Sequence, residues 1–280
     1  MPFLFDKLGY RSGNKTAINK QPWYCGAVLA DGIASANVVG YTSKDVAAGK
    51  YYLIGVQFND TASASKGSVD MNTLIKLSET ITPGTYDADF AGAPELLVLN
   101  AAGTGYDKYY YISDATDDND DPLGYDCWAD GDGYELEDAD KLILGKGFWF
   151  KSATAGSITV SGEVTASADQ LVSFPANTYA IIANPSPVAF SFANVTTTGI
   201  TPGTYDADFA GASEILTLNA AATGYDKFYF ISDATDDNDD PVGYNCWSDG
   251  DGYILEGNQV EAGASFWIKG NAAGTMGFTK

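Results

Sequence analysis

The segment DATDDNDDP occurs twice in the chain, at residues 114–122 and again at residues 233–241. Each copy places five carboxylates and an asparagine within nine residues. Hard cations such as Ca²⁺ take about six to eight oxygen ligands from such loops, and Asp117-x-Asn119-x-Asp121 has the alternating spacing of a calcium loop. Pro122 stands where an EF-hand needs glycine, so the segment predicts calcium binding outside an EF-hand.

A second acidic motif, DGDGY, follows each copy at residues 130–134 and 249–253. It places two aspartates two residues apart on a flexible glycine turn, and a glutamate follows at a matched position in both copies, Glu137 and Glu256. The predicted Ca²⁺ ligands are Asp114, Asp117, Asp118, Asn119, Asp120, Asp121, Asp130, Asp132, Glu137, Asp233, Asp236, Asp237, Asn238, Asp239, Asp240, Asp249, Asp251 and Glu256.

Two acidic positions differ between the copies. Glu135 corresponds to Ile254 and is therefore left out of the predicted ligand set, whereas Asp126 becomes Asn245, which keeps an oxygen ligand. The alternative to a cation site is a solvated acidic loop, because a run of charge usually only faces water. Clustering favours the cation, since carboxylates a few ångströms apart repel by about 1 kcal/mol per pair.

Composition limits the classes of function. The chain has 280 residues, a net charge of −22 and 45% hydrophobic residues, which suffices for packed cores. The charge argues against a nucleic-acid partner, because phosphates are repelled. The chain has no histidine, which removes the commonest general base and zinc ligand. No apolar run reaches the roughly eighteen residues of a membrane span.

The acidic motifs belong to a long internal repeat. The stretches that start at Ile81 and Ile200 align over 57 positions, of which 47 are identical. A period this long predicts tandem domains and not a solenoid. We expect an extended N-terminal arm at residues 1–36, a β-domain at 37–162 and a second, related β-domain at 163–280.

Each repeat is predicted to be all-β. Short runs rich in Tyr, Phe, Val and Ile lie between Gly, Asn, Asp and Pro clusters, which is typical of a β-sandwich or a barrel. In GFWFKS at 147–152, alternation places Phe148 and Phe150 on one face, with Trp149 and Lys151 on the other. VDMNTLIKL at 69–77 predicts a short helix without a counterpart in the second repeat.

Cysteine and tryptophan favour packing over chemistry. Cys127 and Cys246 occupy equivalent positions and Cys25 stands alone. We expect three free thiols, the first two packed as small hydrophobes; the alternative is a crosslink from Cys25 to one of the others, including one across subunits. Four tryptophans on predicted strands favour core or edge packing over sugar-stacking platforms, and these are Trp128, Trp149, Trp247 and Trp267.

Catalysis is not expected. Paired carboxylates such as Asp130 and Asp132 are the residue types that hydrolyse glycosides. Their duplication in both repeats argues against a single tuned active site. The sequence therefore predicts a protein that is not an enzyme.

Part of the chain resembles a known family. IASANVVGYTSKDVAAGKYYLIGVQF at 33–58, together with GFWFKS, is similar to secreted β-rich bacterial repeat proteins. These proteins carry an NVVGY stretch just after export processing and a GFW-type strand late in each repeat. The resemblance implies export and a β-sandwich, and it assigns no chemistry. The predicted 36-residue arm departs from the family, because it stands where a conventional signal peptide would be.

The arm differs in charge from the rest of the chain. Residues 1–30 hold four of the fifteen basic residues and one acidic residue, Asp6, together with several aromatic residues. A basic, aromatic segment on an acidic body favours docking on another copy of the protein, and contacts that do not close give filaments. We therefore expect a self-assembling extracellular or cell-surface structural protein, such as a filament, sheath or surface-layer subunit, stabilised by calcium. The alternatives are a calcium-dependent carbohydrate-binding or adhesive protein with glycan partners, and a phage or virus particle protein.

Overall fold

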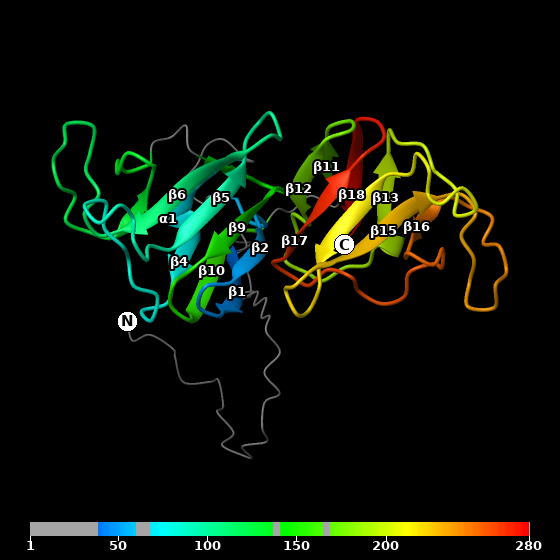
Figure 1. Ribbon diagram of the computed structural model, residues 1–280, viewed down its shortest axis with the longest axis horizontal. Helices are drawn as coiled ribbons and strands as arrows, with labels where there is room; N and C mark the ends of the chain where they lie inside the picture. Colours follow the sequence, from blue (N-terminus) through cyan, green and yellow to red (C-terminus); the bar gives the residue numbers. More distant parts are fainter. Residues whose placement is uncertain (1–38, 60–67, 137–140, 165–168, 280) are drawn as a thin grey trace, which may run out of the picture.

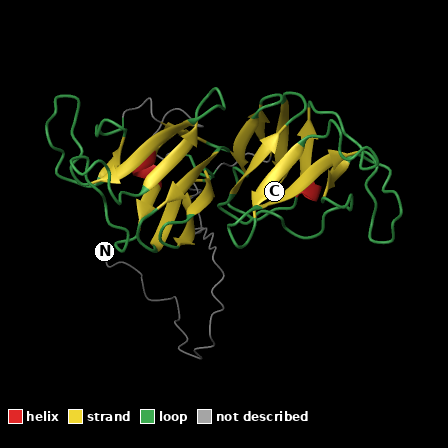
Figure 2. Cartoon of the chain, viewed as in Figure 1, coloured by secondary structure: helices red, strands yellow, loops and turns green. Residues whose placement is uncertain are grey.

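The computed structural model describes residues 39–59, 68–136, 141–164 and 169–279, and it confirms the all-β prediction (Figure 1). Strands and loops make up nearly all of the described chain, and the two helical segments are short (Figure 2). Among the described residues, no helix has the length and apolar character needed to cross a bilayer. The predicted arm lies outside the described residues.

The N-terminal half, residues 39–164, contains two main antiparallel sheets and a small strand pair. In order, the five-stranded sheet consists of β2 (Tyr51–Gly55), β9 (Gly147–Lys151), β5 (Glu95–Leu99), β6 (Tyr106–Ile112) and β7 (Cys127–Ala129). The three-stranded sheet consists of β1 (Val39–Val46), β10 (Gly156–Glu163) and β4 (Ile75–Leu77). β3 (Ser68–Asp70) pairs with β8 (Lys141–Ile143).

The C-terminal half, residues 169–279, repeats this plan. Its five-stranded sheet consists of β12 (Tyr179–Ala183), β17 (Ser265–Lys269), β14 (Glu214–Leu218), β15 (Tyr225–Ile231) and β16 (Cys246–Ser248). Its three-stranded sheet consists of β11 (Asp169–Phe174), β18 (Gly274–Thr279) and β13 (Val195–Thr198). In both halves the two sheets share one buried core, as in a β-sandwich. The predicted domain boundaries stay a prediction.

Strand alternation decides which side chains reach each core. Phe148 and Phe150 of β9 lie fully buried between the two sheets, as the sequence predicts. Trp149 points from the opposite face of β9 and packs with Leu53 and Ile181 in a separate cluster. Because Ile181 belongs to the C-terminal half, this second face is covered by the other repeat and not by solvent.

The predicted helix is shorter than expected. α1 covers only Met71–Leu74, and the carboxylate of Asp70 caps it by accepting a hydrogen bond from the backbone N–H of Thr73 at 2.9 Å. Ile75 is already extended, with φ −102° and ψ 124°, and begins β4. The C-terminal half places a 3₁₀ turn, η1 (Phe192–Asn194), directly before β13, so the segment has a short helical counterpart that the sequence comparison missed.

The two halves meet through matched backbone contacts. The N–H of Gly55 donates to the carbonyl of Gly263, and the N–H of Ala183 donates to that of Gly145, both at 2.8 Å. Gly55 and Ala183 end the equivalent strands β2 and β12, while Gly145 and Gly263 precede the equivalent strands β9 and β17. The same bond is therefore made twice, which is the pattern of a two-fold, isologous contact.

Candidate functional site

A tight turn forms the tip of the first acidic loop. One carboxylate oxygen of Asp117, Oδ1, accepts hydrogen bonds from the N–H groups of Asn119 at 2.8 Å and Asp121 at 3.0 Å. The N–H of Asp117 donates to the carbonyl of Asp121 at 3.0 Å, and Asp120 takes a left-handed φ of 62°. The backbone hydrogen bonds from Asp121 and then Asn119 lower the pKa of Asp117, because they favour the charged carboxylate.

The DGDGY motif makes the same turn. Oδ1 of Asp130 accepts from the N–H groups of Asp132 at 2.9 Å and Tyr134 at 3.0 Å. Gly133 takes the left-handed position with φ 85°. Alternating acidic residues in both motifs thus reflect an aspartate that caps the backbone two and four residues ahead, a use of Asp that needs no metal.

The C-terminal half contains both turns again. Asp236 accepts from the N–H groups of Asn238 and Asp240 at 2.9 and 3.1 Å. Asp249 accepts from those of Asp251 and Tyr253 at 3.0 and 2.9 Å. The pKa of Asp236 is lowered, by its bonds from Asn238 and then Asp240. The described residues therefore contain four copies of one aspartate-capped turn.

Asp114 holds a neighbouring loop in place. Its two oxygens accept from the N–H groups of Tyr86 at 2.7 Å and Asp87 at 3.2 Å. That loop contains two successive left-handed residues, Asp89 and Phe90, with φ of 54° and 57°, a conformation that costs energy in residues other than glycine. Phe90 stacks on Tyr110 at 4.0 Å. Asp233 repeats the role of Asp114 toward residues 205 and 206.

A tyrosine connects the two turns within each half. The hydroxyl of Tyr134 donates to Oδ1 of Asp120 at 2.8 Å, and Tyr253 donates to Asp239 at the same distance. These hydrogen bonds raise the pKa of both tyrosines, because deprotonation would place two negative charges in contact. The linked turns form one acidic loop assembly per half.

The remaining predicted ligands point into solvent. Asp118, Asp121 and Asp132 are exposed, as are their counterparts Asp237, Asp240 and Asp251. Within the described part of the chain, no three His, Cys, Asp or Glu side chains converge in a group that could hold a metal ion. Glu256 is exposed, and Glu137 lies outside the described residues. Calcium binding accordingly stays a prediction, and the alternation that suggested it has a second explanation in the turns.

Glu135 belongs to this region although the repeat comparison excluded it. Both of its carboxylate oxygens accept from the hydroxyl of Tyr125 at 3.1 Å. With Asp117, Asp118 and Asn119 it lines an open hollow of about 210 Å³. Apart from its charge, Glu135 carries no signal of a role in the sequence, because Ile254 stands at the matching position of the second repeat.

The described tryptophans and cysteines are packing residues. Trp128 and Trp247 are buried in the two cores, and Trp149 and Trp267 belong to the cluster where the halves meet. Cys127 and Cys246 are free thiols, as expected. Burial raises the pKa of Cys127 to about 12 and also raises that of Cys246, so neither is an activated nucleophile. Cys25 lies outside the described residues.

The acidic loops lie far apart in the molecule. The loop between β6 and β7 projects from one end of the long axis, and the loop between β15 and β16 projects from the other (Figure 1). The hydrogen-bonded contact between the halves lies between them. Comparisons with protein-family models, with curated proteins and with solved structures gave no match to this chain.

Proposed function

We propose that the protein is a non-enzymatic structural subunit that self-assembles outside the cell or on its surface, with cations such as Ca²⁺ bound at its acidic loops. The observation that carries this proposal is the duplication of one acidic loop assembly at opposite ends of the molecule (Figure 1). A subunit with equivalent adhesive ends can join two neighbours, which is the minimum requirement for a chain of subunits.

The exposed carboxylates support a role beyond the turns. Asp117 and Asp130 accept hydrogen bonds from backbone N–H groups. Within the described residues, by contrast, no side-chain hydrogen bond is formed by Asp118, Asp121 or Asp132. Their concentration on a chain of net charge −22 raises the energy of the free surface, because like charges repel. A hard cation shared between two such loops would remove this repulsion and bridge two subunits.

The predicted arm at residues 1–36 supplies a second route to assembly. Its four basic residues, Lys7, Arg11, Lys15 and Lys20, complement the acidic loops of a neighbouring subunit, and its aromatic residues would gain from burial there. Addition of the arm to a sheet edge would contribute main-chain hydrogen bonds. Basic arm and acidic loop would then form a head-to-tail contact between copies of the chain.

Electron microscopy and sedimentation velocity, with and without calcium, test the assembly. We expect polymers at millimolar calcium and subunits in EDTA. Asp118→Asn combined with Asp237→Asn removes one exposed charge from each loop without touching a turn, and it should raise the calcium concentration needed for assembly severalfold. Asp107→Asn with Asp226→Asn is the matched control. These two residues are exposed and lie near the start of β6 and β15, whereas the acidic loops follow the end of each strand. Equal effects of the two pairs would contradict a role for the loops.

Deletion of residues 1–36 tests the arm separately. The truncated chain keeps every described strand, so its thermal unfolding should be nearly unchanged, while assembly should be lost. Higher salt at fixed calcium should weaken assembly of the full chain, because salt screens the attraction between arm and loops. Polymers of unchanged form from the truncated protein would eliminate the arm and leave the loops as the remaining contact.

A carbohydrate-binding adhesive protein is the second candidate. Tyr86 and Tyr125 are 46% and 52% exposed beside the first acidic loop, and Tyr205 and Tyr244 are 45% and 59% exposed beside the second. Exposed aromatic rings next to carboxylates are able to stack on a sugar and bind its hydroxyl groups. A glycan array separates the two functions, because an adhesive protein must bind selected glycans and release them on chelation.

A further inference from the structure

Two grooves flank the contact between the halves, and they are built from equivalent segments. The first combines β5, β8 and the start of β9 with residues 175–181 of the C-terminal half. The second combines β14 and residues 259–265 with β2. Equivalent backbone thus forms both walls, so side chains alone decide what each groove accepts.

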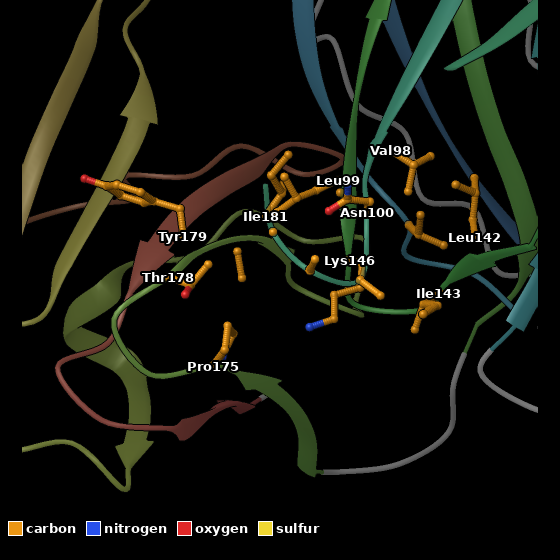
Figure 3. Close-up of a pocket in the computed structure, with 16 residues that line it drawn as sticks. Val98, Leu99, Asn100, Leu142, Ile143, Lys146, Pro175, Thr178, Tyr179 and Ile181 are labelled. Atoms are coloured by element: carbon orange, nitrogen blue, oxygen red, sulfur yellow. The ribbon is translucent and has the colours of Figure 1, made fainter. Parts of the chain in front are cut away.

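The first groove is mainly apolar and contains one cation. Its walls include Val98, Leu142, Ile143, Pro175 and Ile181, and Lys146 reaches into it with its ammonium group toward Pro175 and Thr178 (Figure 3). We call it the Lys146 groove. Its volume of about 260 Å³ corresponds to about nine waters at about 30 Å³ each, which fits a ligand of roughly ten non-hydrogen atoms.

The ammonium group of Lys146 is under-used. Within the described chain it donates one hydrogen bond, to the carbonyl of Ser173 at 2.6 Å, although a lysine has three donors. Among the described residues it forms no ion pair with a carboxylate. Burial lowers its pKa, because the groove withdraws water from the charge. An incoming anion would restore the lost stabilisation.

We propose that the Lys146 groove binds a small amphipathic carboxylate, with its hydrocarbon chain against Leu142 and Ile181 and its carboxylate on the ammonium group of Lys146. The chain length that matches the volume is about eight carbons. An apolar pocket with one convergent charged group is the usual composition of a small-ligand site. The charge gives orientation, and the apolar walls contribute affinity by the area that they remove from water.

The second groove supports this assignment by contrast. Ala264 stands where the first groove has Lys146, and Glu261 stands where it has Ile143. The second groove, of about 200 Å³, therefore has no cation at the position of Lys146 and has a carboxylate at the position of Ile143; its own lysine, Lys44, comes from β1. The two grooves therefore compare one backbone frame with a lysine and with an alanine at this position.

Calorimetry with sodium octanoate and 1-octanol tests the proposal on the full chain. We expect one octanoate site per chain. Its affinity should be at least tenfold higher than that for octanol, because octanoate accepts a charge-assisted hydrogen bond from the ammonium group. Lys146→Ala introduces the residue that the second groove already carries, and it should abolish the preference for octanoate while octanol binding changes little.

A second variant keeps the test valid if Lys146→Ala disturbs folding. Ile143 is 56% exposed, so Ile143→Glu should fold normally, and its carboxylate should weaken octanoate binding severalfold by repelling the ligand or by pairing with Lys146. Val39→Glu, at a 57% exposed position outside the groove, is the matched control. Absence of saturable binding, equal affinity for octanoate and octanol, or octanoate binding unaffected by both groove variants would overturn the proposal.

Discussion

The two repeats have the same capping residues in the acidic loops but different residues at the contact between the halves. Asp114 and Asp233 cap their neighbouring loops with hydrogen bonds of 2.7 and 3.2 Å in both halves. Beside the central contact the two repeats differ: Ala264 stands at the position equivalent to Lys146, and Ser265 at the position equivalent to Gly147. The loops act at separate places and can stay identical, whereas residues near a two-fold contact meet their own counterparts and must differ where space is short.

Gly147 and Ser265 show this constraint directly. A Cβ atom on Gly147 would overlap the side chain of Ser265 and would lie 2.6 Å from Cγ2 of Ile181. Ser265 uses its hydroxyl to donate to the carbonyl of Ile54 across the contact at 3.0 Å. Only one of the two equivalent positions therefore has room for a side chain, and the C-terminal half holds it.

The largest expected effect comes from filling both positions. Gly147→Ser should destabilise the protein by about 1–3 kcal/mol or more, because it overpacks a buried contact. Ser265→Gly alone should cost about 1 kcal/mol through the lost hydrogen bond. The double variant, which exchanges the two residues, should be more stable than Gly147→Ser. Urea unfolding of all four proteins measures the coupling, and purely additive costs would contradict the shared-space explanation.

Calcium should stabilise both ends equally. Extracellular calcium modules bind at about 10⁻⁴–10⁻³ M, so several millimolar calcium should add about 1–2 kcal/mol per site and raise the melting temperature above that in EDTA. Asp118→Asn with Asp121→Asn should remove the contribution of the N-terminal loop, and calorimetry should then show half the stoichiometry.

The matched pair Asp237→Asn with Asp240→Asn should have the same effect at the other end. All four residues are exposed and leave the capping aspartates in place, so a loss of binding would not reflect a broken turn. Melting curves that coincide in calcium and EDTA would rule out structural calcium at either end.

Strand content and strand faces were predictable from the sequence, because both follow from local alternation. Phe148 and Phe150 face the core, and Trp149 faces away from it, as the period of two requires. The turn at Asp117-x-Asn119-x-Asp121 was not predicted. Spacing alone does not show that Asp117 accepts hydrogen bonds from the N–H groups of Asn119 and Asp121, and calcium binding beside this turn stays a prediction.

The contact between the halves was not predictable for a different reason. Gly55 and Gly263 are far apart in sequence, and neither has a local signal that indicates a partner. The groove around Lys146 depends on that contact, so it was invisible as well. Glu135 was left out of the predicted ligands because only acidic residues present in both repeats were included. It lines the hollow beside Asp117 and Asp118 although the second repeat has no acidic residue at that position.

The two core tryptophans offer a smaller contrast. The indole N–H of Trp247 donates to the hydroxyl of Thr197 at 3.0 Å, whereas that of Trp128 has no hydrogen-bond partner among the described residues. Both Trp→Phe variants lose packing, but only Trp247→Phe also loses a hydrogen bond. Its free energy of unfolding should therefore fall by about 1 kcal/mol more than that of Trp128→Phe. Equal losses in chemical unfolding would contradict this difference.

The smallest expected effect is the acid sensitivity of the capped turns. Backbone hydrogen bonds lower the pKa of Asp117 and of Asp236 in the folded protein. A carboxyl group with a lowered folded pKa stabilises the protein above its unfolded pKa of about 4, and this stabilisation is lost as the pH falls through the folded value. Protonation of the other carboxylates acts in the opposite direction, because it relieves repulsion in a chain of net charge −22.

The wild-type curve alone therefore cannot isolate the turns, and a matched comparison is needed. Asp117→Asn with Asp236→Asn removes two charges that cap the backbone, whereas Asp118→Asn with Asp237→Asn removes two exposed charges next to them. Melting temperatures measured from pH 6 to about pH 3 should show a weaker loss on acidification for the first pair than for the second. Each single variant should give half of that difference, because the two turns have the same hydrogen bonds. Parallel curves for the two pairs would contradict this explanation. They would mean that a charged carboxylate at Asp117 and Asp236 stabilises the turn no more than a neutral group does.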